Sequence, residues 1–236
     1  MANEAAAAPL EGGSRWEDLV DVYFSPAELY ARRAGDNWLK PFLLLIVIGI
    51  VFYYLFLPLN SLIWEAAMLE SAPPGADVER MRQGAAVMKY VGGIFVPINY
   101  FLLIAFTALV LKVASSVLEP AARWGEAFTI ATYAFFVTVL QQILGTLIVF
   151  LKSRSAGLSM QDVSFGALRF VEQPDPVLRA LLGRLDLFAV WTAALCAVGL
   201  IVVVRMPRAK AIITAAIAWL ALALPSLASS AMFGRR

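Results

Sequence analysis

The stretch that decides the fold is Leu185–Val204, which reads LDLFAVWTAALCAVGLIVVV. Its only charged residue is Asp186, and the next charge along the chain is Arg205. The apolar run after Asp186 approaches the ~20 residues that a helix needs to cross a bilayer. Apolar and polar residues do not alternate in it, so it does not predict a strand of a transmembrane barrel. It predicts a membrane-spanning helix, because a helix satisfies its own backbone groups inside lipid.

The same pattern recurs in four more charge-free windows, at 41–64, 90–111, 127–151 and 211–234. Of the 236 residues, 61% are hydrophobic and 15% are charged, whereas about 25% are charged in a typical soluble domain. We therefore predict an all-α integral membrane protein, a bundle of five transmembrane helices with short interfacial amphipathic helices. The predicted spans are 39–60, 91–117, 127–151, 186–205 and 211–232.

Residues 1–15, rich in Ala and Gly, are predicted to be a disordered tail ahead of a single membrane domain, 16–236. Five spans place the two termini on opposite sides of the membrane. A plain count of Lys and Arg on the two sides does not decide the orientation. The two short links belong to the N-terminal side, and short links carry most weight. This places the N-terminus in the cytoplasm and the C-terminus outside.

Several function classes are made improbable by composition. The chain has no histidine and a single cysteine, Cys196, so it lacks the commonest metal ligand and proton shuttle and cannot form an intramolecular disulfide. The net charge of +2 is too small to indicate nucleic-acid binding. No acidic or basic residue lies deep in a predicted span, where proton-coupled transporters usually need one. We expect no catalytic residue, no metal and no cofactor, and we predict that the protein is not an enzyme.

The segment before the first span has the pattern of a capped helix. Ser25 would be the N-cap, Pro26 the first helical residue and Glu28 the partner of a capping box, and the helix would end near Gly35. Aromatic and basic residues surround it, as at a membrane interface. The segment is either a docking surface for a partner or anionic lipid, or a plain interfacial anchor, which is the simpler interpretation.

A second amphipathic helix is predicted at 177–185. Leu178, Leu181 and Leu182 share one apolar stripe there. Asp186 follows as a helix N-cap, where the helix dipole favours an acid, or as a partner of Arg179 or Arg184.

Polar residues inside the spans have two interpretations. Asn99, Gln141 and Gln142 either line a solute path or headgroup site, or they form hydrogen bonds between helices, which is the more common role. Near the span ends, Arg123 and Glu126 have the spacing of a surface ion pair, which contributes little energy.

Two further sets of residues are expected to have structural roles rather than chemical ones. Trp38, Trp124 and Trp191 are expected to anchor the spans at the interface. Gly145 and Gly199 are expected to let helices approach closely.

The layout resembles the Yip (Ypt-interacting protein) domain family of five-span membrane proteins, in its bacterial form. Four stretches carry the resemblance, which covers roughly residues 18–230: VYFSP at 22–26, WGEAF at 124–128 before Tyr133, the leucine helix at 177–185, and LDLFAVW at 185–191 with Gly199-Leu200. The chain departs from many relatives in having Phe135 and Phe136 where they have a proline.

The resemblance implies a cytoplasmic N-terminus. Eukaryotic relatives bind small Rab-type GTPases and act in vesicle traffic, and no GTPase-contact residue is carried over to this chain. The implied setting is the bacterial cytoplasmic membrane.

The leading hypothesis is a non-enzymatic membrane protein that binds a partner or shapes the bilayer through residues 16–34 and 177–185. Its partners would be the lipid bilayer and a membrane or cytoplasmic protein, and a homo-oligomer is left open. The candidate contact residues are Ser25, Pro26, Glu28, Arg123, Glu126, Leu178, Leu181, Leu182, Asp186 and Trp191. The alternative is a small permease or lipid-handling transporter in which Asn99 and Gln141 face a cavity. An intramembrane enzyme ranks last.

Overall fold

The protein is helical throughout the part of the chain that the structure describes. This computed structural model describes residues 15–58, 61, 68, 72, 75, 77–152, 164–171, 178, 181–183 and 185–224. The helices are α1 (Arg15–Phe24), α2 (Pro26–Arg33), α3 (Leu39–Leu55), α5 (Val78–Val91), η1 (Gly92–Ile94), α6 (Phe95–Leu118), α7 (Trp124–Phe135), α8 (Val137–Lys152), η3 (Ala167–Phe170), α10 (Leu187–Val203) and α11 (Arg208–Ala221). Among these residues the only β-type pairing is one bridge, Gly166 to Asp186. The predicted all-α class is confirmed, and the predicted tail at 1–15 lies almost wholly outside the described residues.

Two continuous helical segments in the described chain, Val78–Leu118 and Trp124–Lys152, are long and apolar enough to cross a membrane. They contain the second and third predicted spans. Two shorter apolar helices, α3 and α10, contain most of the first and fourth. The fifth corresponds to α11, and the predicted end of that span lies outside the described residues. The count of five spans therefore stays a prediction.

The start of α2 was predicted correctly, but the capping box was not. Ser25 is the N-cap and Pro26 the first helical residue, yet the Ser25 side chain makes no capping hydrogen bond. The Ser25 backbone N–H already donates to the Asp21 carbonyl at the end of α1, so Glu28 finds no free donor to cap. The helix ends as expected, with Gly35 at a φ of 86°, where a residue without a Cβ is favoured.

The helices α5 and α6 follow Asp77, whose carboxylate accepts a hydrogen bond from the Arg80 N–H at 3.1 Å. A short 3₁₀ turn, η1, then separates α5 from α6. Tyr53 and Tyr54 of α3 donate hydrogen bonds to the carbonyls of Lys89 and Tyr90 at 2.8 and 3.1 Å. These bonds attach α3 to the end of α5, next to the 3₁₀ turn. A 3₁₀ turn within a long helical segment often marks a hinge or local strain.

The third predicted span is two helices rather than one, because the chain breaks at Phe136 between α7 and α8. No proline causes the break. Polar side chains instead take the backbone groups that it frees: the Thr138 hydroxyl donates to the Phe135 carbonyl at 2.7 Å, and the Tyr23 hydroxyl donates to the Phe136 carbonyl at 2.8 Å. Side chains that insert into the hydrogen-bond ladder are a known cause of helix kinks.

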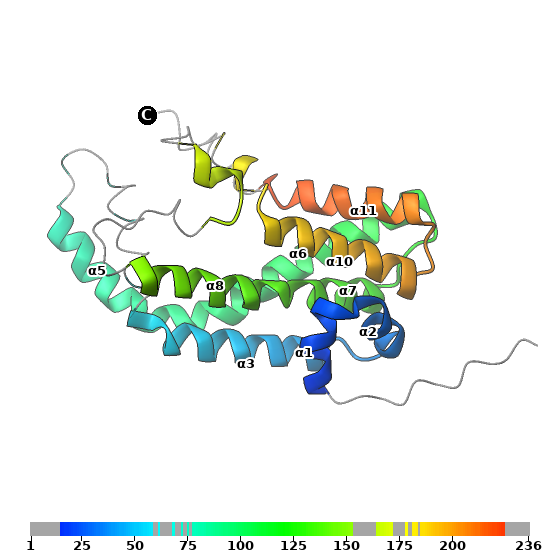
Figure 1. Ribbon diagram of the computed structural model, residues 1–236, viewed down its shortest axis with the longest axis horizontal. Coiled ribbons are helices and arrows are strands. Elements are labelled where there is room, and N and C mark those ends of the chain that lie inside the picture. Colours follow the sequence, from blue (N-terminus) through cyan, green and yellow to red (C-terminus); the bar gives the residue numbers. More distant parts are fainter. Residues whose placement is uncertain are drawn as a thin grey trace, which may run out of the picture.

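The stretch that opens with Leu185 and Asp186 forms α10, which occupies the centre of one half of the bundle. It packs against α2, α7 and α11, and these helices lie together in Figure 1. A tight link joins α10 to α11, with Arg205 at a φ of 58° and the Met206 N–H donating to the Leu200 carbonyl. The fourth and fifth predicted spans therefore pack side by side as a helical hairpin.

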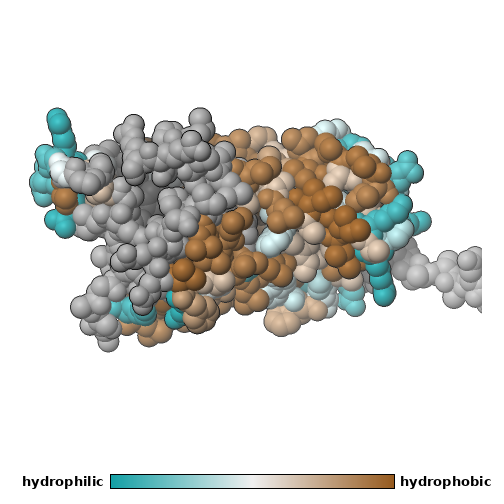
Figure 2. All heavy atoms as spheres, turned by 90° about the horizontal axis from the view of Figure 1, so that it is seen from above, coloured by the Kyte–Doolittle hydropathy of each residue, from teal (hydrophilic) through white to brown (hydrophobic). Residues whose placement is uncertain are grey.

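The outer surface of the bundle is apolar along its middle. Figure 2 shows hydrophobic residues over this region and hydrophilic residues at the end where Figure 1 places the α6–α7 and α10–α11 links. On α11 the exposed apolar side chains are Ile212, Ile213, Ile217 and Leu220. A continuous apolar surface of this kind marks contact with a membrane or with another protein.

Candidate functional site

The two N-terminal helices are joined to the bundle by a buried polar network centred on Asp18. This carboxylate is only 3% exposed. It accepts hydrogen bonds from Arg33 Nε at 2.9 Å, from Arg32 Nη2 at 3.0 Å and from the Tyr133 hydroxyl at 3.0 Å. Asp21 adds a second ion pair with Arg32. One acid on α1 thus connects both arginines at the end of α2 to α7.

Three tyrosines extend this connection. The Tyr30 hydroxyl donates to the Ile130 carbonyl at 3.1 Å, and the Tyr23 hydroxyl reaches Phe136 as described above. The Tyr30 and Tyr133 rings meet edge to face with centroids 6.2 Å apart. Each of these contacts joins residues about a hundred positions apart in sequence, so α1 and α2 form a fixed layer on the bundle. We call α1 and α2 the N-terminal layer.

The charges and burial in this layer change the pKa values of its groups. The hydrogen bond with Asp21 raises the pKa of Arg32. Burial alone would lower the pKa of Arg33, but its hydrogen bond and charge interaction with Asp18 outweigh that effect and raise it. Burial raises the pKa of Tyr23 from 10.0 to about 12. Both arginines therefore stay charged, and Tyr23 stays a hydrogen-bond donor well into the alkaline range.

Alkaline pH is expected to loosen the N-terminal layer. Between pH 10 and about pH 12 the unfolded chain loses the Tyr23 proton while the folded chain keeps it. The folded state binds more protons in this window, so stability falls as pH rises. The Tyr23→Phe variant should lose about 1 kcal/mol at neutral pH through the missing hydrogen bond, and its stability should decline less steeply over this window. Unfolding midpoints measured from pH 9 to 12 in lipid discs would test this, and equal slopes in the two proteins would contradict it.

The face of α1 turned away from the bundle is apolar. Trp16, Val20 and Phe24, spaced four residues apart, are 69%, 56% and 81% exposed. Asp18 and Val22 on the opposite face are buried. In Figure 1, α1 runs across the long direction of the bundle. We call these three residues the α1 stripe.

The predicted ion pair of Arg123 and Glu126 is confirmed. Arg123 Nη2 lies 2.7 Å from Glu126 Oε1, and the Arg123 backbone N–H donates to Glu126 Oε2 at 2.7 Å. The Arg123 side chain is largely exposed, so the pair contributes little energy, although the backbone bond caps the start of α7. Ser25, Pro26 and Glu28 lie at the junction between α1 and α2.

The other predicted contact residues are placed around the start of α10. Asp186 caps this helix, accepting from the Phe188 N–H at 2.9 Å, as predicted. The alternative pairing of Asp186 involves Arg179 and Arg184, which lie outside the described residues. The described leucines of the second amphipathic segment, Leu178, Leu181 and Leu182, have helical backbone, and the first two are exposed.

Trp191 packs against other aromatic side chains, and its place in an interfacial belt stays a prediction. Its ring packs edge to face against Tyr23 with centroids 5.8 Å apart, and it lies parallel to Phe188. It therefore joins α10 to the N-terminal layer. Trp38 stacks on Phe128 at 4.5 Å, near the first residues of α7.

The three intramembrane amides line two different cavities. Asn99 and Gln142 line one of about 610 Å³, between α3, α6 and α8. Gln141 lines another of about 400 Å³, between α6, α8, α10 and α11. Gln142 Nε2 donates to the Tyr100 hydroxyl at 3.0 Å, and that hydroxyl lies 3.2 Å from Thr138 Oγ1. Gln142 thus has the helix-bridging role, and the structure does not bring Asn99 and Gln141 together at one cavity.

Comparison with known families identifies the family to which this chain belongs. A family model described as the Yip1 domain matches residues 20–230. The chain belongs to the Yip1 domain family. A search of curated proteins and a search of solved structures gave no match. The matched range begins within α1, after Trp16 and Asp18, and runs beyond the described end of α11, so α2 and both cavities lie within the Yip1 domain.

The two glycines expected to allow close helix approach in this Yip1 domain behave differently. A Cβ on Gly199 would lie 2.7 Å from Ile130 of α7, so α10 and α7 approach each other there. A Cβ on Gly145 would meet no atom within 4 Å among the described residues. The expectation holds for Gly199, whereas the described residues place no neighbouring helix against Gly145.

Sequence reasoning missed the residues that hold the N-terminal layer on the bundle. Asp18, Arg33, Tyr30 and Tyr133 were not among the candidates, although they form the buried network. One signal was present: Asp18 and Val22 lie four residues apart, so an acid shares the helix face that carries a buried valine. Tyr133, within a uniformly apolar run, gave no such signal.

Proposed function

We propose that this chain is a non-enzymatic multi-pass membrane protein whose N-terminal layer is a docking surface for a membrane-associated protein partner. The observation that carries the proposal is the α1 stripe, held in place by the buried Asp18 network. Large aromatic side chains are enriched at protein interfaces, and Trp16 and Phe24 are the two most exposed members of the stripe. Because α1 is already fixed, little ordering entropy opposes binding. Family membership also suggests membrane-associated protein partners.

The proposed topology has five spans with the N-terminus in the cytoplasm and the C-terminus outside, in a bacterial cytoplasmic membrane. Its support is the gathering of basic residues at one end of the bundle. Arg123 belongs to the α6–α7 link, and Arg205 and Arg208 belong to the α10–α11 link. Basic residues in short links favour the cytoplasmic side. The α1 stripe would then face a cytoplasmic partner beside the membrane surface.

The second amphipathic segment offers a further contact. Leu178 and Leu181 are exposed, and they precede Asp186 and α10 in the sequence. Replacing Leu178, Leu181 and Leu182 with serine would weaken partner or membrane association while the spans still insert. Unchanged association in this variant would restrict the docking surface to the N-terminal layer.

A site-specific photo-crosslinking experiment tests the proposal. A photo-reactive residue would replace Val20, at the centre of the α1 stripe, in the full chain in its native membrane. Val113 on α6 provides a matched control, because it is 55% exposed and Val20 is 56% exposed. We expect a discrete protein adduct from Val20, and none from Val113.

The adduct should disappear when Trp16 and Phe24 are replaced by serine, and it should persist when both are replaced by leucine. An adduct of twice the mass of the chain would identify a second copy as the partner. Lipid adducts alone from Val20 would contradict partner docking and leave the stripe as an interfacial anchor.

A further inference from the structure

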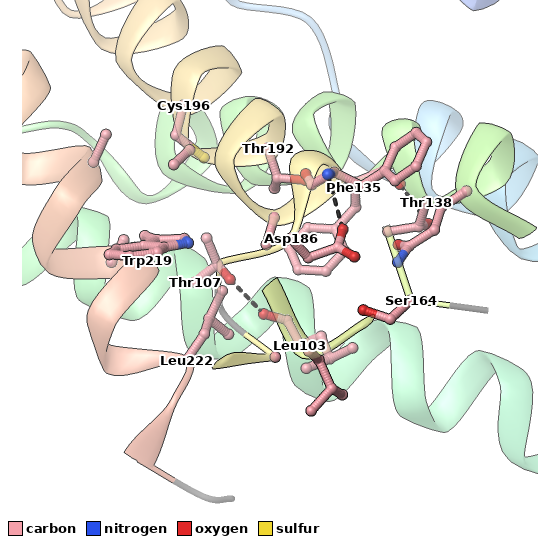
Figure 3. Close-up of a pocket in the computed structure, with 18 residues that line it drawn as sticks. Leu103, Thr107, Phe135, Thr138, Ser164, Asp186, Thr192, Cys196, Trp219 and Leu222 are labelled. Carbon is pink, nitrogen blue, oxygen red and sulfur yellow. Dashed lines mark hydrogen bonds between the residues drawn. The ribbon is translucent and has the colours of Figure 1, made fainter. Parts of the chain in front are cut away.

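The cavity lined by Gln141 has the properties of a ligand site. We call it the Asp186 cavity. It lies between α6, α10, α11 and the start of α8 (Figure 3), and its volume is about 400 Å³. Small-molecule sites usually have volumes of roughly 300–1,000 Å³ and are mostly apolar with a few polar groups.

The carboxylate of Asp186 and the apolar side chains of α11 lie on different sides of this cavity, and Thr107 lies beside Trp219 and Leu222. Its apolar wall includes Trp219, Leu222, Ala215 and Ala218 of α11. Its polar wall consists of Thr138, Gln141, Ser164 and Asp186. In Figure 3, Thr138, Ser164 and Asp186 lie on one side, and Trp219 and Leu222 lie on the other. Such a division fits an amphiphile, with a polar head at one end and a hydrocarbon chain at the other.

Three threonine hydroxyls of the cavity lining are already used as donors, and Asp186 supplies acceptors. The hydroxyls of Thr107 and Thr192 donate to carbonyls of their own helices, both at 2.8 Å, and that of Thr138 donates to the Phe135 carbonyl. The Asp186 carboxylate can act only as a hydrogen-bond acceptor. It accepts from the N–H groups of Phe188 and Phe165, which use two of its roughly four lone-pair sites. A ligand head that donates hydrogen bonds matches this wall.

Asp186 is also a buried carboxylate for which the described residues supply no counter-charge. It is 7% exposed, and within the described part of the chain no Lys or Arg pairs with it. A charge held in apolar surroundings strongly favours a partner of opposite charge or several hydrogen bonds. An anionic head would be repelled from this position.

The carboxylate is held firmly in place. Gly166 pairs with Asp186, the Ala167 N–H donates to the Leu185 carbonyl at 3.1 Å, and the Phe165 and Phe188 rings meet with centroids 5.0 Å apart. A Cβ on Gly166 would collide with the Leu185 carbonyl oxygen, so only glycine permits this approach. The start of α10 and the segment before η3 therefore fix the polar wall before any ligand arrives.

We propose that the Asp186 cavity binds an amphiphile with a hydrocarbon chain and a hydrogen-bond-donating head, an ammonium or hydroxyl group. The head contacts Asp186, and the chain lies along α11. The source is either a bilayer lipid with an ammonium headgroup or a free long-chain amine or alcohol. This site is separate from partner docking, since it uses α6, α8, α10 and α11 and none of the α1 stripe.

Fluorescence quenching in vesicles tests the proposal. Trp219 lines the cavity, so the difference in quenching between the full chain and its Trp219→Phe variant reports on acyl chains there. The chain is reconstituted with a small fraction of phosphatidylethanolamine or phosphatidic acid carrying brominated acyl chains. We expect Trp219 quenching at a lower fraction of the ammonium lipid than of phosphatidic acid, whose head is a phosphate with neither an ammonium nor an alcohol group. Dodecylamine and dodecanol should relieve the quenching, and dodecanoate should not.

A pair of matched variants isolates the charge. Asp186→Asn keeps an N-cap residue and removes the charge, and it should weaken binding of the ammonium lipid about tenfold, since a hydrogen bond to a charged group contributes about 1.5–3 kcal/mol. Asp77→Asn makes the same change at the N-cap of α5 and should leave quenching unchanged.

Three results would overturn the proposal: no quenching that depends on Trp219, equal quenching by the two lipids, or equal effects of the two asparagine variants. The comparison of the two lipids needs no variant, so it holds even if Asp186→Asn fails to fold. Mass spectrometry of chain extracted with native lipids distinguishes the sources: an ammonium phospholipid at stoichiometric level identifies the bilayer, and a single-chain amine or alcohol identifies a free amphiphile.

Discussion

Replacing Asp18 with alanine is expected to release the N-terminal layer from the bundle and to lower the free energy of unfolding by roughly 3–5 kcal/mol. Removing one partner of a buried ion pair leaves the other charge uncompensated, and effects of this size follow. Asp18 contacts Arg32, Arg33 and Tyr133 together, so one substitution leaves all three without their shared partner. Hydrogen exchange should show loss of protection over α1 and α2, and smaller changes in α6 and α11.

A double variant provides the control. Asp18→Leu combined with Arg33→Leu removes both charges, and apolar replacements of buried pairs are often neutral. It should recover a large part of the stability lost in Asp18→Ala. The interpretation of the network as the attachment of the N-terminal layer would be wrong if Asp18→Ala kept full protection of α1 and α2.

The second large effect is expected at Gly199. In Gly199→Ala the new Cβ would lie 2.7 Å from Ile130, so α10 and α7 must separate or Ile130 must move. Overpacking of this kind costs about 1–3 kcal/mol. Gly145→Ala is the matched control on α8, where the Cβ meets nothing among the described residues, and a helix gains about 1 kcal/mol from this change. Thermal unfolding in lipid discs should shift down for the first variant and up or not at all for the second. Equal shifts would show that the contact with Ile130 is not tight.

The features that could be predicted from sequence depend on residues close to one another in the chain. Charge-free apolar runs located the long helices, because a membrane selects for them over some 20 consecutive residues. Asp186 indicated the start of α10 because an N-cap acts within three residues. The link from Arg205 to Lys210 is short enough to allow only a tight antiparallel turn.

The features that could not be predicted depend on partners distant in sequence. The break at Phe136 has no proline or glycine to announce it, and its stabilising donor is Tyr23, 113 residues earlier. The capping box predicted at Ser25 does not form, because the Ser25 backbone N–H, the donor that the box needs, already donates to the Asp21 carbonyl at the end of α1. Trp191 was predicted as an interfacial anchor, and its sequence position gave no sign of Tyr23 beside it.

The candidate site was predicted in part. The segment from residue 16 to 34 was selected for its aromatic and basic residues, and the structure makes it the N-terminal layer. The amides were selected for their depth, and the structure divides them between two cavities. Asp186 was considered a cap, an ion-pair partner of Arg179 or Arg184, or a contact residue, but not a cavity residue, because a cavity formed by four helices leaves no pattern in the sequence of any one of them.

The contact between Tyr30 and Ile130, which joins residues 100 positions apart, sets the order of assembly. The N-terminal helices are synthesised first, yet the surface that receives them exists only when α7 and α10 are in place. Until then Leu29, Tyr30 and Asp18, all buried in the finished protein, have no partner on the bundle. Docking of α1 and α2 onto the bundle therefore follows the synthesis of α7 and α10. A chain arrested before α7 would leave the apolar faces of its N-terminal helices unburied.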